Sequence, residues 1–458
     1  MEDDKKLVLQ TEETKDFSPR VTYSYITGAI LATNALKDVY TVVDGPDCVH
    51  MKTQFVQGNH DFLSTLVSVS GHHRVANTAL HVMSMATGWE DHLRATLERV
   101  ASHPHAGGVL LTSMPMAQVT AVDYERLCKE VSKQTCKPVV PVMARSLTGD
   151  WLDGYEDVLV ALAKRIDLPC TKKSENKVGI VGYLMDRNEG DHKGNIKEIR
   201  RIFGALGLEV VSIWLEGQPF ASLARIAEAS TIISFPYGRR AARWVARRTG
   251  ARLVECDYPF GLIATEHFVS KLGEVFGRTA EAKVFLKREL SEVVPPCEFV
   301  IPFIFQHRRA GYIGDPVLVK GFYETLELFG ATLDFAVITN SHSHAQGLTS
   351  ESLGGADLLV YPRNKTLITF LVGKSKVNAL SLVVTNNAGV ALLAKKGLGV
   401  VEFGFPSYLS HSLGERPFLG FRGFLNFVDS MATAMRMAEA QKYSDRFLFS
   451  EAVSPSSE

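Results

Sequence analysis

The sequence lacks several features that would assign it to a class at once. Its six cysteines are scattered without a Cys-x-x-Cys pair, which excludes a disulfide framework or a zinc site held by one segment. Neither sign of charge is in excess: 50 basic and 50 acidic residues give no electrostatic case for binding nucleic acid or an anionic membrane surface. No apolar run is long enough to span a membrane, and the charged start of the chain has no apolar segment behind it. We therefore expect a cytoplasmic protein with no nucleic-acid or membrane partner, whose metal centre, if it has one, draws ligands from several places or from another chain.

What the chain does have is length and a regular alternation of strands and helices. Its 458 residues, 46% of them hydrophobic, suggest about three domains, each with a core of its own. Apolar strands alternate with amphipathic helices throughout, which is typical of parallel sheets. The fold class predicted is α/β, with three Rossmann-like, doubly wound parallel-sheet domains. The charged linker 171–177 and the Pro295–Pro296 break set the boundaries: a polar, loosely held N-terminal arm (1–20), domain I (21–172), domain II (173–295), and domain III with a C-terminal helix (296–458).

Strands are expected at eleven places along the chain. In open α/β sheets ligands collect at the carboxyl ends of the strands, so a site between the domains is expected. The expected strands lie near 38–43, 108–111 and 138–143 in domain I, 178–183, 210–215, 231–235 and 252–255 in domain II, and 310–313, 334–338, 357–361 and 399–403 in domain III.

Cys48 is the most informative single residue. Val42 and Val43 are typical of the interior of a parallel strand, and Gly45-Pro46 ends that strand, which places Cys48 at its carboxyl end. A thiol at this place faces a cleft. The alternative is a buried, inert cysteine, because cysteine is among the most buried residue types.

Other short motifs have a structural explanation as well as a functional one. Gly58-Asn-His-Asp61 matches the end of a metallophosphoesterase signature, but the upstream Asp-x-His and the Gly-Asp-x-x-Asp that complete a two-metal centre are absent, so a polar turn is favoured. The glycines of 179–182 and 311–315 lack the full GxGxxG spacing and favour close packing of strand, turn and helix over dinucleotide binding.

Eight of the 14 histidines lie between His50 and His105, including the pair His72-His73. Adjacent side chains on an extended segment point to opposite sides, which argues against joint metal ligation by the pair. Arg239 and Arg240, at the start of a helix, are candidates for reaching a carboxylate or phosphate, and their alternative is a solvated helix face.

Taken together, the motifs resemble the component 1 proteins of nitrogenase and their relatives, which include the nitrogenase cofactor scaffold and the dark-operative protochlorophyllide and chlorophyllide reductases. The resemblance covers nearly the whole chain, and the order and spacing of the motifs agree with the family. The matching segments are Asp44–Cys48, Gly108–Pro115, Gly190–Ile199, Phe203–Leu208, Pro259–Phe268, Gly314–Pro316, Glu402–Tyr408 and Pro417–Gly423.

The resemblance implies a shared iron–sulfur cluster. Members that build a full eight-iron cluster use three cysteines per chain, whereas the second and third positions here fall near 70–73 and at Met114, where there is no cysteine. The remaining Cys48 resembles subunits that give one thiolate to a 4Fe-4S cluster whose other three thiolates come from a homologous partner, since a cubane needs four ligands. The resemblance implies that Cys48 is a metal ligand, that Gly45 and Pro46 shape its turn, and that Ser113 and Met114 line the cluster pocket. It further implies His72 and His73 as proton donors or substitute ligands. Asp47 and His50 are the nearest further substitute ligands.

The anchors of the nitrogenase cofactor are missing. Ser234–Pro236 stand about where the catalytic subunit has its cofactor cysteine, and Gly404 about where it has its histidine. Cys256, farther along, is expected to be a packed residue at a strand end. The chain is therefore expected to be a subunit of a nitrogenase-like reductase that does not fix nitrogen. The resemblance implies three partners: a homologous three-cysteine subunit, an ATP-dependent iron–sulfur reductase and a small organic or tetrapyrrole-type substrate.

Two alternatives remain open. The chain could be a non-catalytic scaffold for a metallocofactor or tetrapyrrole precursor, because an apolar cleft with few charges suits that role as well. It could also be a cluster-free binding or regulatory protein in which Cys48 is merely buried.

Overall fold

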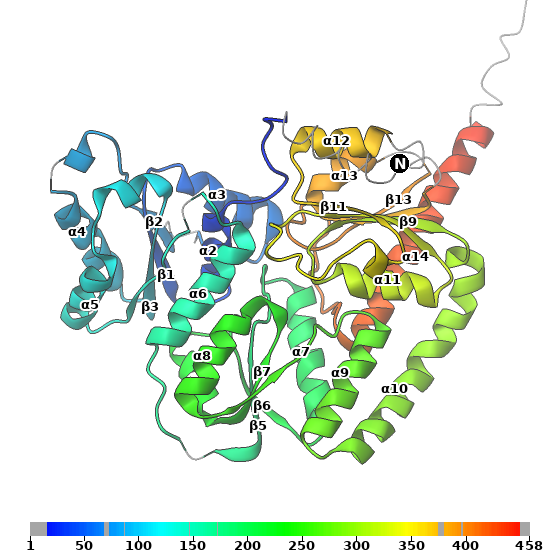
Figure 1. The fold of residues 1–458 in the computed structure, drawn as a ribbon, viewed down its shortest axis with the longest axis horizontal. Helices are drawn as coiled ribbons and strands as arrows, with labels where there is room; N and C mark the ends of the chain where they lie inside the picture. Colours follow the sequence, from blue (N-terminus) through cyan, green and yellow to red (C-terminus); the bar gives the residue numbers. More distant parts are fainter. Residues whose placement is uncertain are drawn as a thin grey trace, which may run out of the picture.

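The computed structural model has three parallel β-sheets, each flanked by helices (Figure 1). This confirms the predicted α/β class with three parallel-sheet units. We call them unit I (blue to cyan in Figure 1), unit II (green) and unit III (yellow to red). The structure describes residues 16–67, 73–86, 88–145, 147–171, 173–373, 380–394 and 397–448.

The sheet of unit I has the strand order β2-β1-β3-β4, with every pair parallel. Strands β1 and β3 are buried along their whole length, as expected for central strands covered on both faces. Asp44 pairs with Ser113 in the register, so β1 and β3 end level with each other. The strands are β1 (Val39–Asp44), β2 (Val75–Asn77), β3 (Gly108–Ser113) and β4 (Val139–Pro141).

The other two sheets repeat this plan. Unit II has the order β6-β5-β7-β8 and unit III the order β11-β10-β9-β12-β13, all parallel. Their strands are β5 (Ser174–Val181), β6 (Glu209–Ile213), β7 (Ala229–Ser234), β8 (Arg252–Glu255), β9 (Arg309–Gly314), β10 (Thr332–Ile338), β11 (Asp357–Val360), β12 (Leu382–Thr385) and β13 (Gly399–Glu402).

The helices connect the strands in chain order. Unit I carries α2 (Tyr25–Asn34), α3 (Val49–Phe55), α4 (Trp89–Ala101), α5 (Tyr124–Thr135) and α6 (Trp151–Arg165). Unit II carries α7 (Gly190–Ala205), α8 (Arg239–Thr249), α9 (Leu262–Val275) and α10 (Thr279–Val300). Unit III carries α11 (Val319–Leu328), α12 (Asn364–Gly373), α13 (Asn387–Leu393) and α14 (Gly420–Leu448).

Two glycines let helices α2 and α6 touch backbone to backbone. A Cβ added to Gly28 would lie 1.7 Å from the carbonyl oxygen of Trp151, and one added to Gly154 would lie 2.0 Å from that of Tyr25. Only a residue without a side chain fits at either point. The crossing holds α6 in place, and the N-terminus of α6 carries two buried aspartates considered below.

Two expectations from the sequence are corrected. Helix α10 does not stop at Pro295-Pro296 but continues to Val300 and into a π-helical turn over Ile301–Phe305. Each proline removes one backbone N–H donor and is costly inside a helix, but α10 accommodates the pair near its C-terminal end. The described end of the N-terminal arm, 16–20, is also not loose: Asp16 accepts hydrogen bonds from the backbone N–H and hydroxyl of Thr366.

No helix among the described residues is long and apolar enough to cross a membrane. The domain boundaries proposed from the sequence stay a prediction.

Candidate functional site

Cys48 lies at the carboxyl edge of the sheet in unit I, in the turn between β1 and α3. Its side chain is exposed, whereas Cys128, Cys256 and Cys297 are buried. The cysteine precedes the first residue of α3. Buried, inert packing is therefore not the state of this thiol in the isolated chain.

A buried carboxylate anchors the turn that carries Cys48. Asp44, fully buried, accepts hydrogen bonds from Trp89 Nε1 (3.1 Å), the Tyr124 hydroxyl (2.7 Å) and the Thr78 hydroxyl (2.8 Å). The Thr78 oxygen in turn accepts from the N–H of Gly45 at 2.9 Å. Burial raises the pKa of Asp44 although these donors oppose the rise. These hydrogen bonds fix the turn in place. The sequence did not reveal them, because the residues that donate to Asp44 come from three other segments of the chain.

The predicted pocket residues meet at this edge. Gly45 lies against the side chain of Met114, since a Cβ on the glycine would come within 2.8 Å of Met114 Cγ. Pro46 and Met114 are half-buried, while Ser113 is buried in the sheet. The structure therefore brings Gly45, Pro46, Ser113 and Met114 together around the base of the Cys48 turn.

Histidines lie close by. The rings of His50 and His73 have centroids 6.1 Å apart, and His50 Nε2 is 2.7 Å from the side-chain nitrogen of Asn77. Both histidines are exposed. His72, the other predicted proton donor, lies outside the described residues.

Exposed apolar side chains surround the carboxyl edge of this sheet. They lie on the connections that follow all four strands, and each exposes more than half of its surface. We call them the apolar rim: Met51, Val82, Met83, Val119 and Met143. Large apolar groups gathered on one edge are typical of a surface that another protein covers.

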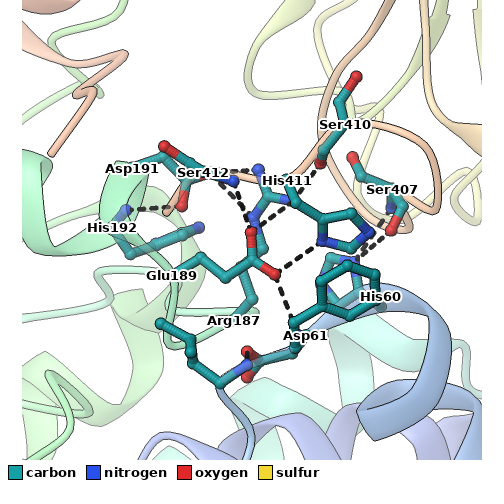
Figure 2. Close-up of polar contacts among 12 residues, drawn as sticks. His60, Asp61, Arg187, Glu189, Asp191, His192, Ser407, Ser410, His411 and Ser412 are labelled. Atoms are coloured by element: carbon teal, nitrogen blue, oxygen red, sulfur yellow. Dashed lines mark hydrogen bonds and ion pairs between the residues drawn. The ribbon is translucent and has the colours of Figure 1, made fainter. Parts of the chain in front are cut away.

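A second candidate site lies where the three units meet (Figure 2). His60 of unit I, fully buried, accepts a hydrogen bond at 3.0 Å from the backbone N–H of Ser407 in unit III. Its other ring nitrogen lies 3.6 Å from the carboxylate of Asp186 in unit II. The segment Gly58–Asp61, which matched part of a phosphoesterase motif, thus serves as a junction between units.

Asp186 also pairs with a second histidine. His192 Nε2 lies 2.5 Å from Asp186 Oδ1, and His192 Nδ1 lies 2.8 Å from the hydroxyl of Tyr183. Burial raises the pKa of Asp186, but the ion pairs with His192 and His60 outweigh it, so the pKa is well below the usual range. Burial lowers the pKa of His192, but the Asp186 and Asp191 carboxylates outweigh it and the net shift is upward. The buried pair is therefore held in its charged form.

Glu189 forms a further contact between the units (Figure 2). This fully buried carboxylate accepts from the backbone N–H groups of Phe62 (3.0 Å) and Ser412 (2.7 Å), and it lies 2.8 Å from Nδ1 of His411. The ring of His411 stacks on that of Phe62 at 3.5 Å. One carboxylate of unit II thereby connects units I and III.

A small cavity lies beside this junction. Its volume is about 30 Å³, which is room for one or two water molecules. Asp315 of unit III lines it: its Oδ1 accepts from the Tyr237 hydroxyl (3.0 Å) and the N–H of Val317 (2.6 Å), while its buried Oδ2 has no hydrogen-bond partner among the described residues. Burial raises the pKa of Asp315 to about 6. The cavity therefore holds an acid that titrates near neutral pH.

A larger cleft separates units II and III. Its volume is about 380 Å³, within the range of small-molecule sites. It is lined by segments that follow β7, β8, β9 and β10, among them Pro236, Cys256, Pro316 and Leu348. Tyr258 lines both the cleft and the small cavity. The carboxyl ends of strands from two sheets thus meet at one site, as expected for open α/β sheets.

The loops that follow strands in the three units do not all line one site. Tyr237 and Phe405, from the loops of units II and III, line the small cavity, whereas Cys48 and Met114 lie at the edge of unit I. Cys256 is buried at the end of β8, as expected, and burial raises its pKa to about 11.

The arginines do not form an anion site. Arg239 donates to the carbonyl oxygens of Ser234 and Cys256, and Arg240 pairs with Asp157 at 2.9 Å. Their charges serve the packing of α8 on its neighbours.

Sequence reasoning missed Asp186, Glu189, His192, Asp315 and His411. Asp186 and Glu189 stand just before the matched segment Gly190–Ile199 and His192 lies within it, while Asp315 lies within the matched segment Gly314–Pro316; these matches were the one signal available. Nothing local marked His411, because its partner Glu189 is far away in the sequence.

The sequence and the fold were both compared with known proteins. Residues 24–436 match the family model described as nitrogenase component 1 type oxidoreductase. The chain is 21% identical to the nitrogenase iron-molybdenum cofactor biosynthesis protein NifE of Methanosarcina barkeri, over 87% of this chain and 85% of that protein. It is also 21% identical to the nitrogenase vanadium-iron protein beta chain of Trichormus variabilis, over 89% and 91%. A solved structure titled nitrogenase Cp1 at pH 6.5 superposes with a TM-score of 0.77 at 13% identity, covering 92% of this chain and 93% of that one.

Proposed function

Because the chain belongs to the nitrogenase component 1 type oxidoreductases, we propose that it is a subunit of a nitrogenase-like reductase that does not fix nitrogen. In this proposal an ATP-dependent iron–sulfur reductase supplies electrons, and a small organic or tetrapyrrole-type molecule receives them. The observation that carries the proposal is the exposed thiol of Cys48 at a strand end, on the same edge of the sheet as the apolar rim.

The donor set fits a cluster shared between chains. A cubane needs four ligands. Among the described residues, the one group of three or more side chains placed to hold a metal ion does not include Cys48. One exposed thiol within an apolar surface suits a 4Fe-4S cluster completed by three thiolates of a homologous subunit that covers the rim. When bound, the cluster would relay single electrons.

The surroundings of Cys48 would tune such a cluster. The hydrogen-bonded Asp44 fixes the turn, Met114 supplies an apolar wall, and a covering subunit would exclude water; burial and hydrogen bonding set the potentials of iron–sulfur clusters. His50 and His73, whose rings lie 6.1 Å apart, are the proposed proton carriers at this edge.

The cleft between units II and III is the proposed substrate site. Its volume suits a small molecule, whereas the junction cavity, with room for one or two waters, is too small for a multi-metal cofactor. Gly404 lines that cavity and offers no side chain to a metal. These observations support a role other than nitrogen fixation.

Asp315 is the proposed proton source. It lines the small cavity together with Tyr237 and Tyr258, and Tyr258 also lines the cleft. Its pKa is raised to about 6. A general acid is most effective when its pKa lies near the working pH.

The decisive experiment is anaerobic purification of the assembled complex with wild-type protein or Cys48→Ser. We expect absorbance near about 400 nm and bound iron in the wild-type complex, as four-iron clusters show, and loss of both in the variant. Cys128→Ser, Cys136→Ser and Cys256→Ser are matched controls and should keep the iron. Full iron content in Cys48→Ser would refute the assignment, and a stable four-iron cluster in the isolated monomer would refute the partner requirement.

A scaffold that binds a metallocofactor or tetrapyrrole precursor without turnover is the second candidate, favoured by the similarity to a cofactor biosynthesis protein. Turnover of a bound substrate with the reductase and ATP separates the two. A wild-type complex without iron would leave the third candidate, a cluster-free binding or regulatory protein.

A further inference from the structure

A buried group of polar side chains joins units I and III next to the cleft between units II and III. Asp150 and Asp153 lie at the start of α6, and His344 lies in the loop after β10. One oxygen of each carboxylate and one ring nitrogen of His344 all lie within 4.8 Å of one another. The two carboxylates are almost fully buried, and the histidine is one-fifth exposed.

The distances match those between ligands of one metal ion. His344 Nε2 lies 3.2 Å from Asp153 Oδ1 and 3.5 Å from Asp150 Oδ1. Ligand atoms arranged tetrahedrally at about 2.1 Å from a zinc ion lie about 3.4 Å apart. Small movements of these side chains would therefore suffice to bring all three atoms onto a single ion.

Two polar atoms in the group lack hydrogen-bond partners among the described residues. His344 Nε2 lies at ion-pair distance from Asp153 and Asp150 but is not aligned for a hydrogen bond with either. Asn340, fully buried, gives its side-chain nitrogen to Asp150 Oδ2 at 3.2 Å, while its Oδ1 has no partner among the described residues. An orphaned buried polar atom costs about 1–3 kcal/mol, and a bound ion would remove that cost.

The remaining hydrogen bonds hold the carboxylates in a fixed geometry. Asp150 accepts from the backbone N–H groups of Leu152 (2.9 Å) and Ser341 (2.8 Å), and Asp153 accepts from the N–H of Asp150 (2.9 Å). Partners of this kind orient metal ligands.

The charge of the group is compatible with a divalent ion. Arg145 contacts Asp153 at 2.5 Å and Asp157 at 2.8 Å, and Asp157 also pairs with Arg240 at 2.9 Å. In the ion-free site a protonated His344 would balance part of the charge of Asp150 and Asp153. A divalent ion would replace that proton, and His344 would then bind as a neutral ligand.

We propose that Asp150, Asp153 and His344 form a site for one divalent transition-metal ion that fastens unit I to unit III. Two carboxylate oxygens and one imidazole nitrogen suit zinc or manganese better than magnesium, which prefers oxygen ligands throughout. Asn340, whose side-chain amide contacts Asp150, is a candidate for a fourth ligand. His344 also lines the cleft between units II and III, which gives an ion a route to the site.

The test uses the full chain, stripped with a chelator and then titrated with Zn²⁺ by calorimetry. We expect one high-affinity ion per chain, a rise in melting temperature on binding, and about a 100-fold loss of affinity in His344→Ala. His342→Ala is the matched control, because His342 lies two residues earlier in the same loop and is exposed. It should bind Zn²⁺ as the wild type does.

Because Asp150 caps α6, substitutions there can unfold the chain, so Asp153→Asn and a spectroscopic probe complete the test. Co²⁺ bound at this site should show ligand-field bands without thiolate charge transfer, and these bands should vanish in His344→Ala. Two results would overturn the proposal. One is equal Zn²⁺ affinity in wild type and His344→Ala, and the other is a wild-type dissociation constant weaker than micromolar.

Discussion

Tyr237 of unit II donates a hydrogen bond of 3.0 Å to Oδ1 of Asp315 in unit III, while Oδ2 of the same carboxylate lies buried without a hydrogen-bond partner among the described residues. The pKa of Asp315 rises to about 6 because the charged form is desolvated. The native state therefore holds the proton more tightly than the unfolded chain, whose carboxyl titrates near 3.8. The contribution of Asp315 to native stability therefore falls as the pH rises from about 4 to about 6 and then levels off.

Asp315→Asn should remove this pH dependence. A shift of about two pKa units corresponds to about 3 kcal/mol, which is an upper value because the amide leaves its own N–H groups unpaired. Relative to wild type, the variant should become more stable by about 1–3 kcal/mol between pH 4 and pH 7, measured by urea unfolding. Asp167→Asn, at an exposed position, is the control and should leave the profile unchanged. Parallel profiles for wild type and Asp315→Asn would contradict the assignment.

Gly28→Ala should strongly destabilise the protein. The new methyl group would lie 1.7 Å from the carbonyl oxygen of Trp151, a backbone atom that moves only if α2 and α6 separate. We expect a loss of about 3 kcal/mol or more, read from the shift in melting temperature. Gly204→Ala in α7 is the matched control: nothing lies within 4 Å of the added Cβ, so a gain of up to about 1 kcal/mol is expected. Equal melting temperatures for Gly28→Ala and wild type would show that the helices can move apart freely.

The sequence predicts best what depends on neighbouring residues. The alternation around Val42 and Val43 and the Gly45-Pro46 turn place Cys48 at a strand end, and the structure has it there. Strand and helix periods similarly indicated three parallel sheets. The predicted helix break at Pro295-Pro296 was wrong, because the rest of helix α10 outweighs the local helix-breaking tendency of proline.

The junction could not be predicted because its contacts join distant segments. His60 and Ser407 are 347 residues apart, and Glu189 and His411 are 222 apart. Each residue alone has ordinary surroundings in the sequence. Only the folded chain shows that buried carboxylates of unit II meet donors of the other two units.

Val119→Glu should weaken assembly without harming the chain itself. Val119 exposes 76% of its surface in the apolar rim, so the free chain should change by no more than about 0.5 kcal/mol. If a partner covers the rim, the buried charge should reduce association about tenfold or more. Co-purification of the partner and retained iron are the measurements. Val284→Glu in α10, at a position 72% exposed, is the matched control and should assemble normally. Unchanged assembly of Val119→Glu would place the partner elsewhere.

His60→Leu should loosen the attachment of unit III to unit I. The imidazole accepts from the N–H of Ser407, lies 3.6 Å from Asp186 and meets the ring of Phe405 edge-on at 4.9 Å. Leucine keeps the apolar packing but leaves a buried N–H unpaired and removes one partner of a buried carboxylate, which should cost about 2–4 kcal/mol. Because the lost contacts are local to the junction, limited proteolysis should cut the variant within 402–412 faster than the wild type. This increase should be larger than the fall in melting temperature alone would cause. His60→Gln can still accept from Ser407 and should recover part of the loss, while His105→Leu at an exposed site should change neither measurement. A His60→Leu variant with wild-type stability and wild-type cleavage at 402–412 would show that His60 fills space at the junction without holding it together.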